Sequence, residues 1–289
     1  MRILIFGASG MLGNNLFKIF SKNHNFETYG ILRNKSKYDN FFDDFKNLEE
    51  ISDIRNSNEI KKIFKKINPD VVINCVGIIK QKEDINNEID AIQLNSLIPH
   101  SLMKLSKNFG AKLIHFSTDC VFSGKKGNYK ETSIPDADDI YGITKRLGEI
   151  EDKNALTLRT SIIGHELFTQ KSLIDWFLNQ KGSVKGYKNA IFSGLTTTEI
   201  SCILENIILK HKTLSGLFHL SVDPISKFDL LKLVAKIYRK DINIIEDRKV
   251  KINRSLNSSK LSLITGYNSP SWDQLIIELN KFYNEKHKR

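Results

Sequence analysis

Short apolar runs alternate with amphipathic stretches along the first 160 residues, and this alternation restricts the fold more than any other feature of the chain. Near-continuous aliphatic runs are typical of strands buried on both faces, and the amphipathic stretches are typical of helices that cover a sheet. The expected strands are Arg2–Phe6, Thr28–Leu32, Val71–Val76, Lys112–Ser117 and Leu156–Arg159. The expected helices are Met11–Ser21, Ser57–Ile67, Ile89–Phe109 and Tyr141–Glu151. This order predicts an α/β fold with a doubly wound parallel sheet of the Rossmann type.

The rhythm changes after Arg159. Helices are expected at Ser172–Gln180, Glu199–Lys210, Lys227–Arg239 and Trp272–Tyr283, and short strands at Gly216–Leu220 and Ile242–Ile245. No linker rich in Pro, Gly or Ser separates the two parts of the chain. We therefore expect a smaller, intimately packed C-terminal lobe rather than an independent domain.

Composition excludes several classes of protein. The formal net charge is +11, but no nucleic-acid-binding motif accompanies it and the lysines are spread over amphipathic stretches, so no nucleic-acid partner is expected. A positive field instead suits a small anion such as a nucleotide diphosphate. Three widely spaced cysteines, Cys75, Cys120 and Cys202, form no metal-ligand pattern, so no metal site is expected. No apolar run approaches the roughly 18 residues of a membrane helix, and we expect a cytoplasmic protein without membrane contact.

A glycine turn joins the first expected strand to the first expected helix. Gly7, Gly10 and Gly13 follow a GxxGxxG spacing, with Ser9, Met11 and Leu12 between them. Glycine lets the backbone approach phosphate oxygens, and a helix N-terminus offers free N–H groups to the anion. This position predicts that the turn binds the pyrophosphate of a nicotinamide dinucleotide. A tight turn without a ligand is the alternative.

The end of the second strand indicates which dinucleotide is bound. An acidic residue about 20 residues beyond the glycines would grip the ribose 2′-hydroxyl, but Arg33 stands there. A cation suits a 2′-phosphate, so NADPH is favoured, with NADH and an Arg33 that is merely exposed as open alternatives. Asp53 and Ile54 are expected beside the adenine. The predicted dinucleotide-binding domain spans 1–160, joined by parts of 191–221, and residues 161–289 form mainly a substrate-binding lobe.

A tyrosine and a lysine lie four residues apart on an expected helix. Tyr141 and Lys145 share one helix face, where a neighbouring ammonium would lower the pKa of the phenol and suit it to general acid catalysis. Thr118 follows an expected strand at the sheet edge where such folds place their sites, with Ser117 as the alternative hydroxyl. An ordinary amphipathic helix is the competing interpretation of the Tyr–Lys pair.

Taken together, these features resemble an extended short-chain dehydrogenase/reductase, and more narrowly the dTDP-4-dehydrorhamnose reductase family. The similar segments are Ile5–Gly13, Leu113–Gly124, Tyr129–Glu131, Tyr141–Glu149, Leu158–Ser161 and Gly216–Ser221. The resemblance implies NAD(P)H-dependent reduction of the C4 ketone of a nucleotide-linked 4-keto-6-deoxyhexose. Such a reaction belongs to cell-surface polysaccharide synthesis, for example of dTDP-rhamnose for O-antigen.

The resemblance also implies roles for individual residues. Tyr141 would be the general acid, Lys145 would tune it and hold the nicotinamide ribose, and Thr118 would bind the ketone oxygen. Further expected contacts are Cys75 and Val76 with the cofactor, Cys120 and Val121 with the sugar, and Arg254 with the diphosphate. A surface ion pair is the alternative for Arg254. Asn95 could support a proton relay or make a structural bond, and His165 and Glu166 could contact substrate or stay solvated.

Four departures from the family pattern leave the sugar open. Cys120 replaces a Tyr, Ile162 replaces a Trp, Ile78–Gln81 replaces Ala-Tyr-Thr, and Gly194–Thr197 replaces Gly-x-Pro-Thr. A UDP-linked N-acetyl-hexulose reductase, or a nucleotide-sugar epimerase or dehydratase, is therefore an alternative. An alternative of another class is a non-catalytic regulatory subunit on the same scaffold, similar to the β-subunit of methionine adenosyltransferase. A homodimer is an open expectation.

Overall fold

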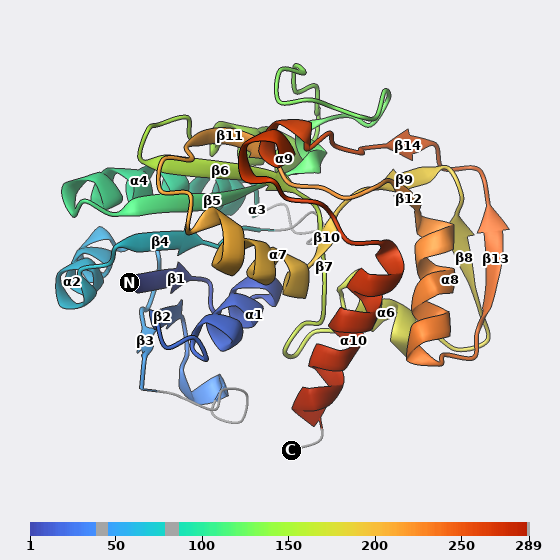
Figure 1. Ribbon diagram of the computed structural model, residues 1–289, viewed down its shortest axis with the longest axis horizontal. Coiled ribbons are helices and arrows are strands. Elements are labelled where there is room, and N and C mark those ends of the chain that lie inside the picture. The colour runs from blue at the N-terminus through green and yellow to red at the C-terminus, as the bar shows by residue number, and fades with distance from the viewer. Residues whose placement is uncertain (39–45, 79–86, 288–289) are drawn as a thin grey trace. The chain divides into compact units, whose positions relative to one another are not determined.

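A seven-stranded sheet organises the first part of the chain, in the order β11-β6-β5-β4-β1-β2-β3 (Figure 1). The computed structural model describes residues 1–38, 46–78 and 87–287. Its sheet strands are β1 Arg2–Phe6, β2 Glu27–Leu32, β3 Leu48–Glu50, β4 Val71–Asn74, β5 Lys112–Thr118, β6 Ala155–Thr160 and β11 Gly216–His219. β1 pairs in parallel with both β2 and β4, so the strand order reverses beside β1. The predicted parallel, doubly wound fold is confirmed, and ligands bind such folds at this reversal.

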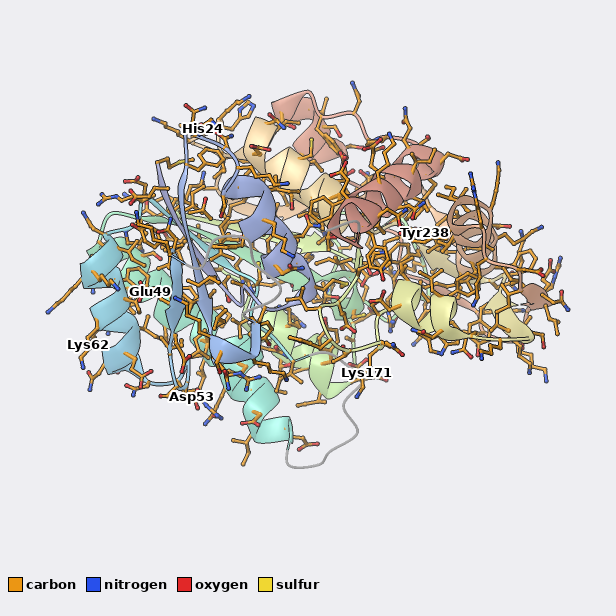
Figure 2. All side chains as sticks on the ribbon, turned by 90° about the horizontal axis from the view of Figure 1, so that it is seen from below. His24, Glu49, Asp53, Lys62, Lys171 and Tyr238 are labelled. Atoms are coloured by element: carbon orange, nitrogen blue, oxygen red, sulfur yellow. The ribbon has the colours of Figure 1, made fainter. Side chains whose placement is uncertain are left out.

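Helices fill the connections between the strands. They are α1 Met11–Phe20, α2 Ser57–Ile67, α3 Asn87–Ala91, α4 Ile98–Asn108 and α5 Ile140–Leu147, with short 3-10 turns η1 Ser36–Tyr38 and η3 Asp119–Val121. α2 begins where the Asn56 side chain accepts hydrogen bonds from two amides of the first turn, and it ends where Asn68 takes a left-handed conformation. Its apolar stripe packs Phe64 into a core that includes Phe6 of β1. Lys62 lies on the opposite, exposed face (Figure 2).

Several predicted elements differ from those observed, and two of these differences concern the loop and helix beyond β4. The helix expected over Ile89–Phe109 is divided into α3, the π-helical turn η2 Ile92–Leu97, and α4. π-Helical turns are rare and frequently lie at functional sites. The strand expected over Val71–Val76 ends at Asn74, so Cys75 and Val76 lie in the loop beyond it.

The second part of the chain combines short strands with helices. Its strands are β7 Ile162–Ile163, β8 Ser183–Tyr187, β9 Ala190–Phe192, β10 Leu195–Thr196, β12 Ile225–Ser226, β13 Asn243–Asp247 and β14 Ile252–Asn253. Its helices are α6 Leu173–Asn179, α7 Thr197–Ile203, the π-helical η4 Leu204–Ile208, α8 Lys227–Tyr238, α9 Ser259–Thr265 and α10 Trp272–His287. They make three small sheets, β10-β7, β12-β9-β14 and β13-β8. A separate core here includes Phe177, Leu230 and Ile276.

The internal contacts divide the chain into two compact units. The first unit comprises Met1–Val121, Ala137–Arg159 and Lys212–Phe218, and the second comprises Phe122–Asp136, Thr160–His211 and His219–Arg289. Within the described part of the chain, no helix combines the length and apolar character that a membrane span requires. The described side chains also contain no group of three His, Cys, Asp or Glu residues placed to hold a metal ion.

Candidate functional site

The glycine turn between β1 and α1 brings backbone segments unusually close. A Cβ on Gly13 would lie 2.1 Å from the Gly7 carbonyl oxygen, so only glycine lets α1 begin so near the strand end. Gly7 has φ +82°, and a Cβ there would lie 3.1–3.2 Å from Val76 and the Cys75 carbonyl group. Gly10 precedes α1 and supplies no side-chain cap to its N-terminus. The turn is therefore a backbone-lined cradle at the positive end of a helix, which fits a pyrophosphate.

Arg33, Asp53 and Ile54 lie beyond the ends of β2 and β3. Arg33 is exposed and directly follows β2, whereas Ile54 is buried. A hydrogen bond from Arg55 holds the pKa of Asp53 below its ordinary value, and the positive charge of Arg33 acts in the same direction. Asp53, which follows β3 in the chain, is labelled in Figure 2. The structure thus brings the predicted 2′-phosphate and adenine residues together.

Arg55 is a further residue of this region that the sequence did not single out. Its guanidinium contacts Asp53 at 2.7 Å and Asp90 at 2.6 Å, and it donates to the Gln93 side chain at 2.9 Å. Arg55 therefore links the loop after β3 to α3 and to the π-helical turn. A salt bridge between separate elements leaves no local pattern in the sequence, so the role of Arg55 could not be predicted from it.

Cys75 and Val76 form the loop beneath Gly7. The Val76 amide donates to the Asn74 side-chain oxygen at 3.1 Å, and the Asn74 amide nitrogen contacts His115 Nδ1 at 3.1 Å. These contacts hold the loop at the carboxyl end of β4. Burial raises the pKa of the Cys75 thiol, so this cysteine is neutral at physiological pH.

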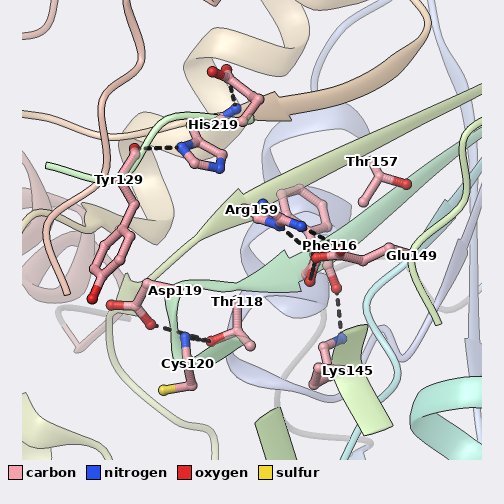
Figure 3. Close-up of polar contacts among 12 residues, drawn as sticks. Phe116, Thr118, Asp119, Cys120, Tyr129, Lys145, Glu149, Thr157, Arg159 and His219 are labelled. Atoms are coloured by element: carbon pink, nitrogen blue, oxygen red, sulfur yellow. Dashed lines mark hydrogen bonds and ion pairs between the residues drawn. The ribbon is translucent and has the colours of Figure 1, made fainter. Parts of the chain in front are cut away.

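Tyr141 and Lys145 of α5 both contact the end of β5, Tyr141 at Thr118 and Lys145 at Phe116; Figure 3 shows Thr118 and Lys145. Asp139 caps α5 by accepting a hydrogen bond from the Gly142 amide at 3.0 Å, one turn before Lys145. Lys145 is buried, and its Nζ donates to the Phe116 carbonyl oxygen at 2.6 Å. The Thr118 hydroxyl accepts a hydrogen bond from the Cys120 amide at 3.1 Å. The site therefore has a phenol, a hydroxyl and an ammonium in one place.

The two hydroxyls at the end of β5 point to different partners. Thr118 forms a side-chain hydrogen bond with Tyr141, whereas the Ser117 hydroxyl donates to Glu149 at 2.6 Å. Successive side chains of a strand alternate between its faces, so only one of the two can face Tyr141. The geometry favours Thr118 over Ser117 as the hydroxyl of the site.

The expected lowering of the Tyr141 pKa is wrong for this arrangement. Burial raises the pKa of Tyr141, Cys120 adds to this effect, and the hydrogen bond with Thr118 only opposes it in part. Lys145 directs its ammonium to the Phe116 carbonyl instead, and burial lowers the pKa of Lys145 to about 8. Tyr141 is therefore a firmly protonated phenol, which is the form a proton donor needs.

Asn95 links the loop after β4 to α5 through its side-chain amide. It lies fully buried within the π-helical turn, where its Oδ1 accepts from the Ile78 amide at 2.9 Å. Its Nδ2 donates to the Ile78 carbonyl and to the Thr144 hydroxyl, both at 3.2 Å. A Cβ on Gly77 would lie 3.0 Å from Asn95 Oδ1 and 3.8 Å from Lys145 Nζ. Asn95 thus holds the loop after β4 beside α5.

The residues expected near the sugar are distributed over both units. Cys120 is half-buried and close enough to Tyr141 to act on it electrostatically, whereas the Val121 side chain is fully buried. Arg254 belongs to the second unit, and its Nε donates to the Phe122 carbonyl at 2.8 Å. This contact joins Arg254 to the backbone of its own unit. Ile79–Gln81, part of one departure from the family pattern, lie outside the described residues.

His165 and Glu166 are bound within the second unit rather than solvated. His165 contacts Asp175 at 2.5 Å through Nδ1 and the Tyr238 hydroxyl at 2.8 Å through Nε2, and its ring stacks on Tyr283. Glu166 accepts hydrogen bonds from two backbone amides of the loop that precedes α6. Both side chains therefore brace α6 and its surroundings.

Comparison with known proteins places this geometry in a family. The bovine (Bos taurus) methionine adenosyltransferase 2 subunit beta is 32% identical over 150 residues, which are 51% of this chain and 41% of that protein. The chain thus matches less than half the length of this relative. The dTDP-4-dehydrorhamnose reductase of Aggregatibacter actinomycetemcomitans is 26% identical over 239 residues, 77% of this chain and 74% of that protein.

A solved structure and a family model cover nearly the whole chain. The dTDP-4-dehydrorhamnose reductase of Bacillus anthracis, solved in complex with NADP, superposes with a TM-score of 0.78 at 21% identity, over 97% of this chain and 99% of that one. This likeness shows the fold. The model of the RmlD substrate binding domain matches residues 1–281. The expected resemblance is confirmed, and the chain belongs to the RmlD substrate-binding domain family.

Proposed function

We propose that this protein is an NADPH-dependent reductase of the C4 ketone of a nucleotide-linked 4-keto-6-deoxyhexose. The observation that carries the proposal is that Tyr141 and Lys145 of α5 both contact the carboxyl end of β5, Tyr141 at Thr118 and Lys145 at Phe116. The relative from Aggregatibacter bears the name of such a reductase and supports the substrate class. A neutral phenol can donate a proton to a ketone oxygen, and a neighbouring hydroxyl can hold that oxygen by a hydrogen bond.

The residues of the first unit fit a nicotinamide dinucleotide. Gly7, Gly10 and Gly13 form the cradle that a Cβ would fill, and this supports a pyrophosphate at the N-terminus of α1. Ser9, Met11 and Leu12 complete the turn, Arg33 would hold the 2′-phosphate, and Asp53 and Ile54 would hold the adenine. Cys75 and Val76 would line the nicotinamide side. The Bacillus anthracis reductase, bound to NADP, supports NADPH as the cofactor, with NADH as an alternative.

The residues of the site would act on the ketone oxygen. A bound NADPH would supply the hydride that reduces C4 of the sugar and would thereby be oxidised to NADP⁺. The Thr118 hydroxyl would hold the ketone oxygen, and the Tyr141 hydroxyl would give its proton to that oxygen as negative charge develops on it. The Lys145 ammonium would then stabilise the Tyr141 phenolate until a proton from water restores the phenol. The reaction consumes one hydride and one proton and yields an alcohol.

The second unit is the proposed binding region for the sugar nucleotide. Arg254 would meet the diphosphate through its guanidinium, and Cys120 and Val121 would lie on the sugar side of the first unit. The division into a dinucleotide-binding region over 1–160 and a mainly substrate-binding lobe over 161–289 belongs to the same proposal. We also propose that the protein acts in the cytoplasm, in dTDP-rhamnose and O-antigen synthesis, and that it assembles as a homodimer.

Turnover of defined sugars tests this function. The purified chain is incubated with NADPH and either dTDP- or UDP-linked 4-keto-6-deoxy sugars, while the nicotinamide absorbance is followed and the product is identified by mass spectrometry. One NADPH oxidised for each reduced sugar supports the proposal, and the better nucleotide decides between the two sugar classes. Product formation with a retained dinucleotide and no net NADPH consumption would identify an epimerase or dehydratase instead.

A regulatory subunit is the second candidate, because the bovine methionine adenosyltransferase subunit matches 51% of the chain. A regulatory role does not need a proton donor held beside a ketone-binding hydroxyl. The decisive observation is stable co-purification with an adenosyltransferase catalytic subunit together with no turnover of any ketosugar. Turnover at an ordinary enzymatic rate of about 1 per second or more would reject this candidate.

A further inference from the structure

A buried carboxylate lies directly behind the proposed site. Glu149 follows α5, and its Oε1 accepts hydrogen bonds from the Ser117 hydroxyl at 2.6 Å and from Arg159 Nε at 2.7 Å. Its Oε2 accepts a second bond from Arg159, through Nη2, at 2.7 Å (Figure 3). The side chains of Arg159 and Glu149 are only 3% and 10% exposed. A carboxylate that is buried, paired and triply hydrogen-bonded holds one fixed position.

The neighbouring backbone is held just as firmly. The Thr157 hydroxyl accepts from the Ile150 amide at 3.1 Å and donates to the Ile150 carbonyl at 2.8 Å. Thr157 and Arg159 are two residues apart on β6 and therefore share one face of the strand. This face of β6 thus anchors the segment 149–150 through a side chain at each position.

Glu149 connects the elements that carry the functional groups. Ser117, which donates to it, lies between Phe116, whose carbonyl binds Lys145, and Thr118 on β5. Glu149 itself comes four residues after Lys145, at the end of α5. We propose that Glu149 is a positioning residue of the site: its carboxylate ties the end of β5 to the end of α5, and so fixes Thr118 against the two functional side chains of α5.

The charge of Glu149 has a second effect on the same site. The titratable groups that face Lys145 are Cys75 after β4, His115 on β5 and Glu149 after α5. Burial raises the pKa of Cys75 and lowers that of His115, so both are neutral near pH 7. Burial lowers the pKa of Lys145 to about 8, and the Glu149 carboxylate acts against this lowering. Glu149 therefore keeps the ammonium protonated near neutral pH.

The kinetic test, which rests on the proposed reductase function, removes the carboxylate. Glu149→Gln is expected to lower kcat by about 10- to 100-fold, the scale of a small misplacement of reacting groups. It should also move the alkaline limb of the pH–rate profile to lower pH, because Lys145 then loses its proton more easily. Glu151→Gln, the same change at an exposed position beside it, should leave both unchanged.

Three further variants keep the test independent of folding defects. Glu149→Gln leaves Arg159 buried without its carboxylate, so the double variant Glu149→Gln/Arg159→Met repeats the test with no unpaired charge. Ser117→Ala retains the charge but breaks the link to β5, and should lower kcat by up to about tenfold without moving the alkaline limb. Combining Ser117→Ala with Glu149→Gln should cost no more than Glu149→Gln alone, since both act through one link.

A titration without substrate separates this inference from the proposed function. The ¹³Cε resonance of Lys145, assigned by its loss in Lys145→Met, is followed against pH in the chain with and without Glu149→Gln. A lower Lys145 pKa in the variant, together with the fall in kcat, supports the inference. If the wild-type chain reduces no ketosugar but Glu149→Gln still lowers the Lys145 pKa, the role of Glu149 is retained and the reductase function is rejected. A folded variant whose Lys145 titrates as in the wild type overturns the inference, whatever happens to kcat.

Discussion

At the scale of single residues, burial keeps the phenol of Tyr141 neutral. Burial, Cys120 and the nearby acidic groups all raise the pKa of Tyr141. The first prediction follows from the proposed proton donation: Tyr141→Phe removes one oxygen and should lower kcat by about 10²- to 10⁴-fold. Thermal unfolding should be nearly unchanged, because the ring that fills the space is kept. Near-normal turnover by the folded variant would remove Tyr141 from the mechanism.

Lys145 should be needed for turnover while its burial lowers the free energy of unfolding. Burial lowers the Lys145 pKa from the ordinary 10.5 to about 8, so between these two pH values the unfolded chain binds more protons than the folded chain. The burial of the charged ammonium therefore lowers the free energy of unfolding in full below pH 8. This destabilisation disappears as the pH rises towards 10.5. Lys145→Met should therefore abolish turnover and raise the free energy of unfolding at pH 7 by about 1–3 kcal/mol. The gain, measured by denaturant unfolding, should shrink at pH 10.

Lys62 supplies the matched control for that experiment. It lies on the exposed face of α2 (Figure 2), so Lys62→Met should change the free energy of unfolding by less than about 0.5 kcal/mol. A destabilised Lys145→Met at pH 7 would mean that the hydrogen bond to the Phe116 carbonyl outweighs the burial of the ammonium.

Residues could be predicted from the sequence where their pattern is local. Tyr141 and Lys145 share a helix face because they are four residues apart, and no tertiary information is needed for that. The choice between Ser117 and Thr118 needed the structure, because strand alternation separates them without indicating which face meets α5. The Glu149–Arg159 pair and Arg55 join separate elements, so their roles follow only from the way those elements pack.

At the scale of elements, the junction of β1 and α1 depends on one glycine. The reason is steric. A Cβ on Gly13 would lie 2.1 Å from the Gly7 carbonyl oxygen, whereas a Cβ on Gly10 would lie 3.3 Å from the same oxygen. Gly13→Ala should thus push α1 away from the turn, lower the free energy of unfolding by about 1–3 kcal/mol, and weaken NADPH binding. Denaturant unfolding and cofactor titration measure the two effects.

Gly10→Ala is the comparison for that prediction. Because its Cβ would meet the same oxygen at a distance that a small shift relieves, it should destabilise the fold less than Gly13→Ala does. Equal stability of Gly13→Ala and the wild type would show that α1 can move without cost, and would contradict the close packing of helix and turn.

Long, strongly patterned elements could be predicted, and short ones could not. α2 spans Ser57–Ile67 as expected, because a capping Asn56 and an apolar stripe mark it locally. The short strands β3, β7, β9, β10, β12 and β14 have two or three residues each, too few for a period-two pattern to stand out. The π-helical turn η2 inserts into a region of continuous helical periodicity, and its wider turn depends on the tertiary bonds of the buried Asn95.

At the scale of the whole molecule, cofactor binding should be visible as stability. A ligand that binds only the folded chain at 100 times its Kd adds about 2.7 kcal/mol to the free energy of unfolding. NADPH should therefore raise Tm in a concentration-dependent way, and by more than NADH at equal concentration if Arg33 holds the 2′-phosphate. Arg33→Ala should remove the difference between the two dinucleotides while NADH still stabilises. Equal shifts with both in the wild type would contradict the preference for NADPH.

The late strand β11 has a consequence for how the chain is made. Gly216–His219 pairs with β6, which ends at Thr160, although the segment Thr160–His211 of the second unit lies between them in the sequence. A ribosome therefore releases β6 with an open edge that stays unpaired until β11 follows. Open edges invite pairing with other nascent chains, and domains usually complete in order of synthesis. Here the first unit cannot complete its sheet before Thr160–His211 of the second unit has been translated, so the growing chain exposes the edge of β6 during that time.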